Sequence, residues 1–476
     1  MGNKGRSTFE TFEDPFPSPP GLLRTKLMRR RDEVSFALSP AVSLDVSEAG
    51  PGADRPRRRA AMRPSFALLL LLTAYVVLSE LVAVRYWVGT CGWPSLAGGD
   101  GGRGAAGEEE GAHRVSRLLV IADPQLTDEV SYEIGRGPLL GLVEWLSDLY
   151  MQRVYGLARR RLDPDHVVVL GDMFDGGHLW DDEAYAAEMA RYVRIFGREV
   201  YDRDRVWHVV GNHDVGYAAN MDPARLRRYE ATFGAANFRR SLAAWNLLGV
   251  NSEALARTRS RRISDETWQF IDQQAAGGLD PAILLLHIPL SREHASTECG
   301  PLRTFGPLEQ YVVWGGETAD VIYQNLVQEA DSKRLLDAVR PKLVLSAHDH
   351  DQCSYVHADG TLEVTIGSIS FLQGNYYPSF ALLTLFTHNG EPEYDLQLCF
   401  LPVQWRYYIA HGIVLLIAAA ARVPHYARMP VSAALRRMPK ATCARIGATA
   451  LLDALAHLLP LLLLAMAYDS RPWLPQ

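Results

Sequence analysis

The sequence has few cysteines and no CxxC pair. Without closely spaced cysteines, the chain lacks the ligand pattern of a zinc knuckle and the dithiol of a thioredoxin-type redox site. One or two disulfides remain open, and the spacing indicates no pairing. The five cysteines are Cys91, Cys299, Cys353, Cys399 and Cys443.

The sequence also lacks a basic stripe in its central part. The formal net charge is -6, and the Lys and Arg residues crowd into residues 1–63 and 422–445. Nucleic-acid binding requires clustered positive charge, so nucleic acid is not an expected partner. Hydrophobic residues make up 48% of the chain and charged residues 22%, a composition that supports a buried core and excludes wholesale disorder. The sequence contains no Asn-x-Ser/Thr acceptor and no repeat of fixed period.

Three apolar runs have the length of membrane-spanning helices, which need roughly 20 residues. They cover residues 65–86, 401–421 and 446–468. For the first run a cleaved signal peptide is the alternative, although its apolar region would be shorter and nearer the N-terminus. The third run contains Asp453 and His457, for which helix-packing contacts explain the sequence as well as a function does.

The distribution of basic residues predicts how these spans are oriented. Cytoplasmic segments beside membrane spans carry an excess of Lys and Arg, so the tail at 1–63 and the loop at 422–445 are expected in the cytosol. The central part of the chain then lies on the lumenal side. The resulting prediction has a disordered basic tail at 1–63, a flexible lumenal stalk at 87–112, a lumenal domain at 113–400 and a short lumenal tail at 469–476.

Polar residues follow a series of short apolar runs inside residues 113–400. These runs read as strands buried on both faces, and helical stretches such as 182–196 separate them. The runs are RLLVIAD ending at Asp123, HVVVLGD ending at Asp172, VWHVVGNHD ending at Asp214, ILLLHIP around His287 and KLVLSAHDH ending at His350. Because α/β folds place their sites at strand ends, we expect these side chains to converge.

Each segment also has an ordinary structural interpretation. A single Asp at a strand end is most often a turn former or a helix cap, and a single His in an apolar run is more often a core residue than a ligand. The combination is more informative than its parts. The order D-x-Q, G-D-x-x-D-G, G-N-H-D, H and H-x-H resembles the signature of the calcineurin-like metallophosphoesterase superfamily.

The resemblance implies an α/β fold, a four-layer αββα sandwich of two mixed sheets, with the membrane helices flanking it. It also implies two metal ions. One would be bound by Asp123, Asp172 and His350, and the other by Asp172, Asn212, His287 and His348, so that Asp172 bridges the two. His213 would act on the substrate as acid or transition-state donor, and Asp214 would hold its ring.

Carboxylate, amide and imidazole ligands without a thiolate suit divalent ions such as Mn, Fe, Zn or Mg. Two such ions can activate a water molecule and neutralise phosphoryl oxygens during an in-line displacement. The sequence departs from the family pattern at Gln125, where a His is usual, and at Ala347, where Gly is usual. A Gln oxygen can bind a hard cation, so Gln125 remains a candidate ligand and favours Mn over Zn. Roles in orienting the ligands, or at the surface, are expected in place of metal binding for the neighbouring residues Asp175, His178, Asp349 and Asp351.

Further segments resemble one branch of the superfamily, which contains the GPI-glycan ethanolamine-phosphate phosphodiesterase and its fungal and plant relatives. These segments are ADPQLTDEVSY, LGDMFDGGH, LVLSAHDHDQC, TIGSISFLQGNYYPSF and CFLPVQ. The resemblance implies a manganese-dependent phosphodiesterase in the membrane of the endoplasmic reticulum or Golgi. Its expected partners are membrane lipid and a GPI glycolipid or GPI-anchored protein, where it would remove ethanolamine phosphate from a mannose of the glycan to permit export. Two alternatives remain: hydrolysis of another phosphoester, such as a phosphoprotein, and a cargo adaptor that kept the fold without turnover.

Overall fold

The computed structural model describes residues 64–95, 115–131, 135–217, 220–255, 261–292, 299–305, 310–315 and 320–427. The expected tail at 1–63, the third span at 446–468 and the tail at 469–476 lie outside these residues, as does most of the loop at 422–445.

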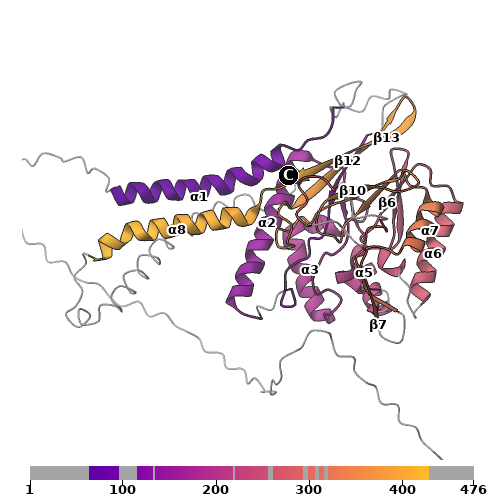
Figure 1. Cartoon of the computed structure of the whole chain (residues 1–476), viewed down its shortest axis with the longest axis horizontal. Helices are drawn as coiled ribbons and strands as arrows, with labels where there is room; N and C mark the ends of the chain where they lie inside the picture. Colours follow the sequence, from indigo (N-terminus) through magenta and orange to yellow (C-terminus); the bar gives the residue numbers. More distant parts are fainter. Residues whose placement is uncertain are drawn as a thin grey trace, which may run out of the picture. The chain divides into compact units, whose positions relative to one another are not determined.

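Two mixed β-sheets form the centre of the fold (Figure 1). The first has the strand order β13-β12-β1-β2-β3, with β1–β2–β3 parallel and β12 antiparallel to both of its neighbours. The second has the order β10-β11-β9-β6-β5-β4, with a parallel centre and antiparallel edges. The strands of the first sheet are β1 Ser116–Ile121, β2 His166–Val169, β3 Val206–His208, β12 Ser379–His388 and β13 Glu391–Phe400. Those of the second are β4 Phe238–Leu242, β5 Trp245–Gly249, β6 Ala282–Leu285, β9 Leu343–Ser346, β10 Cys353–Val356 and β11 Leu362–Thr365.

The apolar strands are buried on both faces because they lie between two different cores. In β1, Leu118 and Val120 join the core between the two sheets, whereas Leu119 and Ile121 join a core on the outer face. Successive side chains of a strand point to opposite faces, so a continuous apolar run can serve both. The second sheet repeats this pattern, since Leu345 joins the inner core and Val344 an outer one.

Helices complete the outer layers. The core outside the first sheet includes side chains of α2 Pro138–Leu162, α3 Asp182–Phe196 and α5 Pro223–Phe233, and the core outside the second includes side chains of α6 Arg261–Ala276 and α7 Glu329–Val339. The helix expected at 182–196 is therefore present. It begins where the side chain of Asp181 accepts a hydrogen bond from the backbone N–H of Ala184, which is a typical N-cap. The predicted α/β fold with two mixed sheets in four layers is confirmed.

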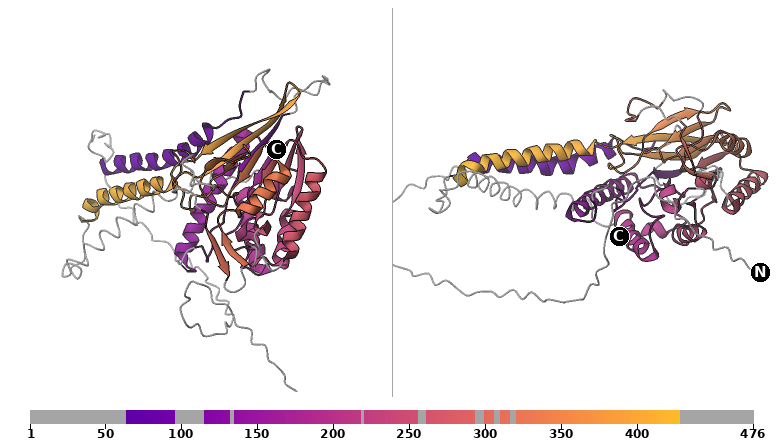
Figure 2. Two further views of the ribbon diagram at one scale, coloured as in Figure 1. Left: turned by 45° about the vertical axis from the view of Figure 1, so that its right-hand side comes forward. Right: turned by 60° about the horizontal axis from the view of Figure 1, so that its bottom comes forward.

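The two long helices at the ends of the described chain pack against each other, as both views in Figure 2 show. They are α1 Pro64–Gly89 and α8 Gln404–Ala427. Leu72 of α1 and Leu415 of α8 pack with Ala418 and Ala419, and Ser79 Oγ lies 3.0 Å from His411 Nε2. In the described part of the chain, no helix meets the combined length and apolarity of a membrane span.

The chain directly after α1 is anchored, so the flexible stalk expected at 87–112 does not begin at residue 87, and residues 96–112 of that stalk lie outside the described residues. The helix continues to Gly89, and Cys91 then forms a disulfide with Cys399 at the end of β13. Trp93 Nε1 donates a hydrogen bond to the carbonyl of Leu162 at 2.6 Å. The Gly-rich composition suggested a linker, but the disulfide and the tryptophan contact hold residues up to 93 against the domain. A second disulfide joins Cys299 and Cys353, and Cys443 lies outside the described residues.

Candidate metal centre

The predicted site residues meet at the carboxyl ends of the parallel strands of both sheets. Asp123 and Gln125 follow β1, Asp172 follows β2, and His287 follows β6. The remaining positions are Asn212 and His213 in the short helix α4 Asn212–Val215 after β3, and His348 and His350 after β9. Parallel strands bring their ends to one edge of a sheet, and face-to-face packing brings the two edges together.

The ligand atoms form two groups that share one carboxylate. Asp172, His287 and His348 offer atoms within 4.8 Å of one another, and so do Asp123, Asp172 and His350. Asn212 extends the first group, because its Oδ1 lies 3.1 Å from His287 Nε2. The structure therefore brings together the residues of both expected metal sets, with Asp172 between them.

The backbone takes an unusual conformation at this site. Positive φ angles of 39° to 67° occur at Asp123, Gln125, Asp172, His348 and His350. Such conformations cost free energy in residues other than glycine and cluster at functional sites. Glycines permit the close approach of neighbouring segments: a Cβ at position 211 would lie 2.2 Å from Asp172 Oδ1, and one at position 171 would lie 2.3 Å from His287 Nδ1.

Two histidines are held with one ring nitrogen facing the site. His287 Nδ1 donates to the carbonyl of Leu170 at 2.7 Å, and Nε2 faces the ligand oxygens, 3.2 Å from Asp172 Oδ2. His348 Nε2 donates to the carbonyl of Gln324 at 3.2 Å, which leaves Nδ1 for the site. Metal-binding histidines are commonly fixed in this way by a hydrogen bond on the other nitrogen.

The donor set fits divalent cations. Asp123 Oδ2, Asp172 Oδ2 and Gln125 Oε1 are buried and accept no hydrogen bond from any residue that the structure describes. Burial raises the pKa of Asp123 to about 8, with the Asp172 charge adding to the increase and His287 opposing it. Buried acceptor oxygens that converge on imidazole lone pairs are costly unless a cation neutralises them. Such ions would be held by the two groups described above, and they would supply an activated water nucleophile and neutralise phosphoryl charge.

His213 stands beside these ligands with its ring oriented by Asp175. Its backbone N–H donates to Asp172 Oδ1 at 2.9 Å, and Nδ1 lies 2.6 Å from the carbonyl oxygen of Asp175 and 3.2 Å from its carboxylate. Burial lowers the pKa of His213, but the charges of Asp172 and Asp175 outweigh it, so the net shift is upward. A raised pKa keeps the ring protonated, which suits a proton donor to a leaving alkoxide.

The role expected for Asp214 is wrong. Its carboxylate does not hold the His213 ring but accepts three backbone N–H bonds, from Asp172 at 3.0 Å, Met173 at 3.0 Å and Gly211 at 2.9 Å. Asp214 is adjacent to His213 in sequence, but its side chain points the other way and ties two loops together. The second Asp of the GDMFD block was the available signal for the true partner.

Gln125 connects the D-x-Q segment to Asp175, the residue that orients His213. Its Nε2 donates to Asp175 Oδ1 at 2.9 Å, while Oε1 stays buried without a partner among the described residues. The side chain thus orients Asp175 with one end and leaves an oxygen for a cation at the other. Whether that oxygen binds metal stays a prediction.

The other neighbouring polar residues hold loops. Asp349 pairs with Arg303, Asp351 accepts from the backbone N–H of Phe305, and His178 contacts the carbonyl of His213. Two residues of the site escaped sequence reasoning. Ser368 Oγ donates to the carbonyl of Asp123 at 2.7 Å, and the Tyr217 hydroxyl lies 3.2 Å from His348 Nε2. Tyr217 follows the GNHD block closely, which was its only sequence signal.

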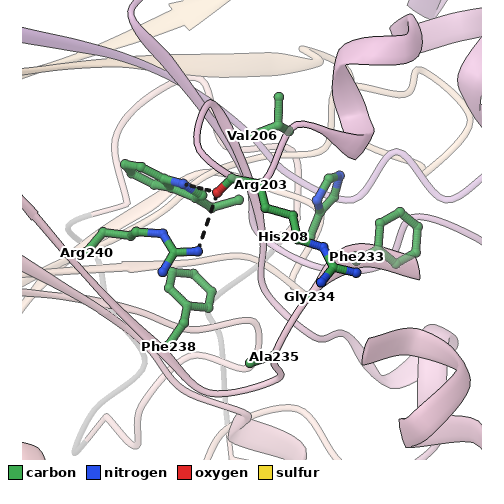
Figure 3. Close-up of a pocket in the computed structure, with 9 residues that line it drawn as sticks. Arg203, Val206, His208, Phe233, Gly234, Ala235, Phe238 and Arg240 are labelled. Carbon is green, nitrogen blue, oxygen red and sulfur yellow. Dashed lines mark hydrogen bonds between the residues drawn. The ribbon is translucent and has the colours of Figure 1, made fainter. Parts of the chain in front are cut away.

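A pocket of about 160 Å³ lies elsewhere, around His208 at the end of β3 (Figure 3). Its arginines are occupied, since Arg203 donates to the carbonyl of Ala231 at 2.8 Å and Arg240 to the carbonyl of Arg203 at 3.4 Å. Burial lowers the pKa of His208 to about 3. The pocket contains none of the expected ligands, so the chemistry belongs to the strand-end site.

The comparisons of the sequence with known proteins identify the family. Residues 116–352 match the family model described as calcineurin-like phosphoesterase. The chain is 30% identical to Metallophosphoesterase 1 of Rattus norvegicus over 395 residues, covering 77% of this chain and 91% of the rat protein. It is 29% identical to Cell division control protein 1 of Saccharomyces cerevisiae over 343 residues, covering 68% of this chain and 66% of the yeast protein. A dimetal phosphatase structure from Danio rerio aligns at 15% identity with a TM-score of 0.33, covering 59% of this chain and 98% of the other. The chain belongs to the calcineurin-like phosphoesterase family and is a metal-dependent phosphoester hydrolase.

Proposed function

We propose that the chain is a phosphodiesterase that removes ethanolamine phosphate from the glycan of GPI anchors, using two manganese ions. The observation that carries the proposal is the shared carboxylate of Asp172, which joins two groups of ligand atoms beside the donor His213. This arrangement suits hydrolysis of a phosphoester by an activated water molecule. The choice of the GPI glycan rests on the loops that resemble the GPI-directed branch, including the TIGSIS segment that supplies Ser368.

The reaction would use the chain's residues as follows. Water adds to the phosphorus atom, and the bond between phosphorus and the alcohol oxygen breaks. His213 gives its proton to the departing alkoxide, and Asp175 keeps the ring in place. The net change is one water consumed and one alcohol released, with no redox partner. The donor set of oxygen and nitrogen ligands without a thiolate accommodates manganese among other divalent ions, and the choice of manganese rests on the resemblance to the GPI-directed branch.

A lumenal location is part of the proposal. Disulfides persist in oxidising compartments and are rare in the cytosol. The two disulfides of the described chain, Cys91–Cys399 and Cys299–Cys353, both belong to the region that the distribution of basic residues assigns to the lumen. The two disulfides support a lumenal location independently of the distribution of basic residues.

Membrane anchoring through α1 and α8 is also proposed. Large apolar side chains project outward from both helices, among them Leu71, Leu78, Ile413 and Leu416, which are 52% to 69% exposed. Contiguous exposed apolar surface needs a covering partner, and lipid would provide one. Tethering would hold the site near a lipid-linked substrate. Carbonate extraction of membranes tests this point, since an anchored chain stays with the lipid pellet and a peripheral one is released.

Mass spectrometry of GPI glycans tests the substrate. Cells without the protein should retain ethanolamine phosphate on the glycan, and wild-type chain should clear it. Asp172→Asn should fail to clear it, because the change removes the shared ligand charge. Asp272→Asn is the matched control, since this Asp forms an exposed pair with Arg334 on the surface and should leave clearance intact.

The alternatives give different results in the same cells. A phosphatase of other phosphoesters would leave the GPI glycans unchanged on deletion, and an adaptor would be rescued equally by wild type and Asp172→Asn. Either result would overturn the proposed function.

A further inference from the structure

The hairpin formed by β7 Val312–Gly315 and β8 Asp320–Gln324 lies against a ligand of the metal centre. It pairs as a separate two-stranded sheet, outside both main sheets. The carbonyl of Gln324 at the end of β8 accepts the hydrogen bond from His348 Nε2. The neighbouring side chain on β8 is Tyr323, whose ring centroid lies 6.1 Å from that of His348.

Three tyrosines make a continuous aromatic surface from the metal ligand outward. Tyr217 begins it with its hydroxyl 3.2 Å from His348 Nε2. The ring centroids of Tyr217 and Tyr323 are 5.2 Å apart, and those of Tyr323 and Tyr311 are 6.0 Å apart. The exposed fraction rises along this series, from 8% for Tyr217 to 37% for Tyr323 and 60% for Tyr311.

The outer rings are not part of a hydrophobic core. The only fully buried apolar side chain of the hairpin, among the residues described, is Val321, which packs on Val312. Backbone contacts hold Tyr311 at the rim: its N–H donates to Asn325 Oδ1 at 2.6 Å, and its carbonyl accepts from the Asn325 N–H at 3.2 Å. These bonds fix the backbone of Tyr311, while the residue stays largely exposed.

The local charges favour a neutral ligand. Among the acidic residues near Tyr323, Asp349 has the largest electrostatic effect on the Tyr323 hydroxyl. The Asp349 carboxylate is paired with Arg303. A cationic ligand would compete with Arg303 for Asp349 and with the metal ions for Asp172, whereas a neutral ring with apolar faces needs no counter-ion.

We propose that Tyr217, Tyr323 and Tyr311 form a subsite that holds a pyranose ring of the substrate next to the metal centre. The inference rests on the proposed function and adds the group that is recognised. A pyranose has apolar C–H faces and a hydroxyl edge, and tyrosine offers a rigid apolar face with a polar tip at little entropic cost. Such aromatic walls with a few polar groups are typical of small-molecule sites.

Two diesters of ethanolamine phosphate test the subsite, one with the C6 hydroxyl of methyl mannoside and one with methanol. With the full-length protein, Tyr311→Ala and Tyr323→Ala should raise KM for the sugar ester about tenfold, as expected for a lost aromatic contact, with kcat unchanged. The methyl ester should show no change in either constant. Tyr323→Phe should behave as wild type, because it keeps the ring, and Tyr201→Ala, an exposed tyrosine of the 3₁₀ turn Arg198–Tyr201, is the control.

Saturation-transfer NMR with methyl mannoside gives a second readout that needs no turnover. Wild type should transfer magnetisation to the C–H protons of the sugar, and the two alanine variants should not. Equal losses on both esters, unchanged KM for the sugar ester, or transfer to adenosine in place of methyl mannoside would overturn the subsite. If wild type hydrolyses neither ester, the proposed function fails, and the NMR result still decides the subsite.

Discussion

Two regions of this protein each surround a buried histidine, and they differ in what faces that histidine. At the metal centre, burial lowers the pKa of His287, but the Asp172 and Asp123 charges outweigh it and raise the pKa well above its usual value. In the pocket of Figure 3, burial alone lowers the pKa of His208 to about 3. Burial of a histidine is therefore no sign of a site; convergence of unsatisfied oxygens on it is.

The backbone separates the two regions in the same way. His208 ends a regular strand and pairs in register with Val169, whereas Asp172 and His348 occupy strained left-handed conformations. Such strain persists only where surrounding contacts enforce it, and it lowers the stability of the fold. The metal centre carries this cost, whereas the backbone at His208 does not.

Asp172→Asn should have the largest effect. It removes the one negative charge common to both ligand groups, so phosphodiester hydrolysis should fall at least ~1000-fold and the bound metal should drop below two ions per chain. Steady-state kinetics with metal analysis by plasma mass spectrometry measures both. A variant that keeps two metals and wild-type activity would contradict the assignment of Asp172.

His213→Ala should lower kcat by about 100-fold or more while leaving the metal content intact, because it removes a proton donor and no ligand. Asp175→Asn should lower kcat less, by about tenfold, since it only loosens the ring of His213. For both variants, kcat is measured with an ester of a poor leaving group and with a p-nitrophenyl ester, whose leaving group needs no proton. An equal loss of kcat with both esters would contradict the role of His213 as the acid.

Asp214→Ala should act on stability. Three buried backbone N–H groups lose their acceptor, and the free energy of unfolding should fall by about 3 kcal/mol. Asp181→Ala is the matched control, because this Asp accepts one N–H at the start of α3 and should cost about 1 kcal/mol. Denaturant unfolding compares the two. If Asp214→Ala retains full stability and loses only activity, Asp214 acts on His213 directly, and the structural role assigned to it is contradicted.

His208 should produce the smallest effect, and only on stability at low pH. The unfolded chain takes up a proton near the ordinary pKa of 6.5, whereas the folded chain does so only near pH 3. The stabilisation is therefore fully present above pH 6.5 and declines as pH falls toward 3, by about 2 kcal/mol at pH 5. Thermal unfolding of wild type and His208→Gln between pH 7 and pH 5 measures it. Wild type should lose more stability than the variant, and activity at pH 7 should match.

Much of the fold was predictable because its signals are local. Apolar runs such as RLLVI and HVVV are buried on both faces, as continuous apolarity in a short strand predicts. The capped helix at 182–196 has its bounds in the sequence. The order of acidic, amide and imidazole residues at strand ends likewise named the candidate metal ligands that the structure gathers, although it named neither Ser368 nor Tyr217.

What the sequence determined by itself was thus the strands, the core periodicity and the list of chemical groups. Only the tertiary structure decided which of them touch. Asp123 reaches the backbone of His348 across 225 residues, and the Cys91–Cys399 disulfide spans 308. The choice of Asp175 over Asp214 as partner of His213, and the placement of Tyr323 beside His348, also depend on packing. Contacts between distant segments follow from how sheets and loops pack in three dimensions. Local sequence propensity does not predict these contacts.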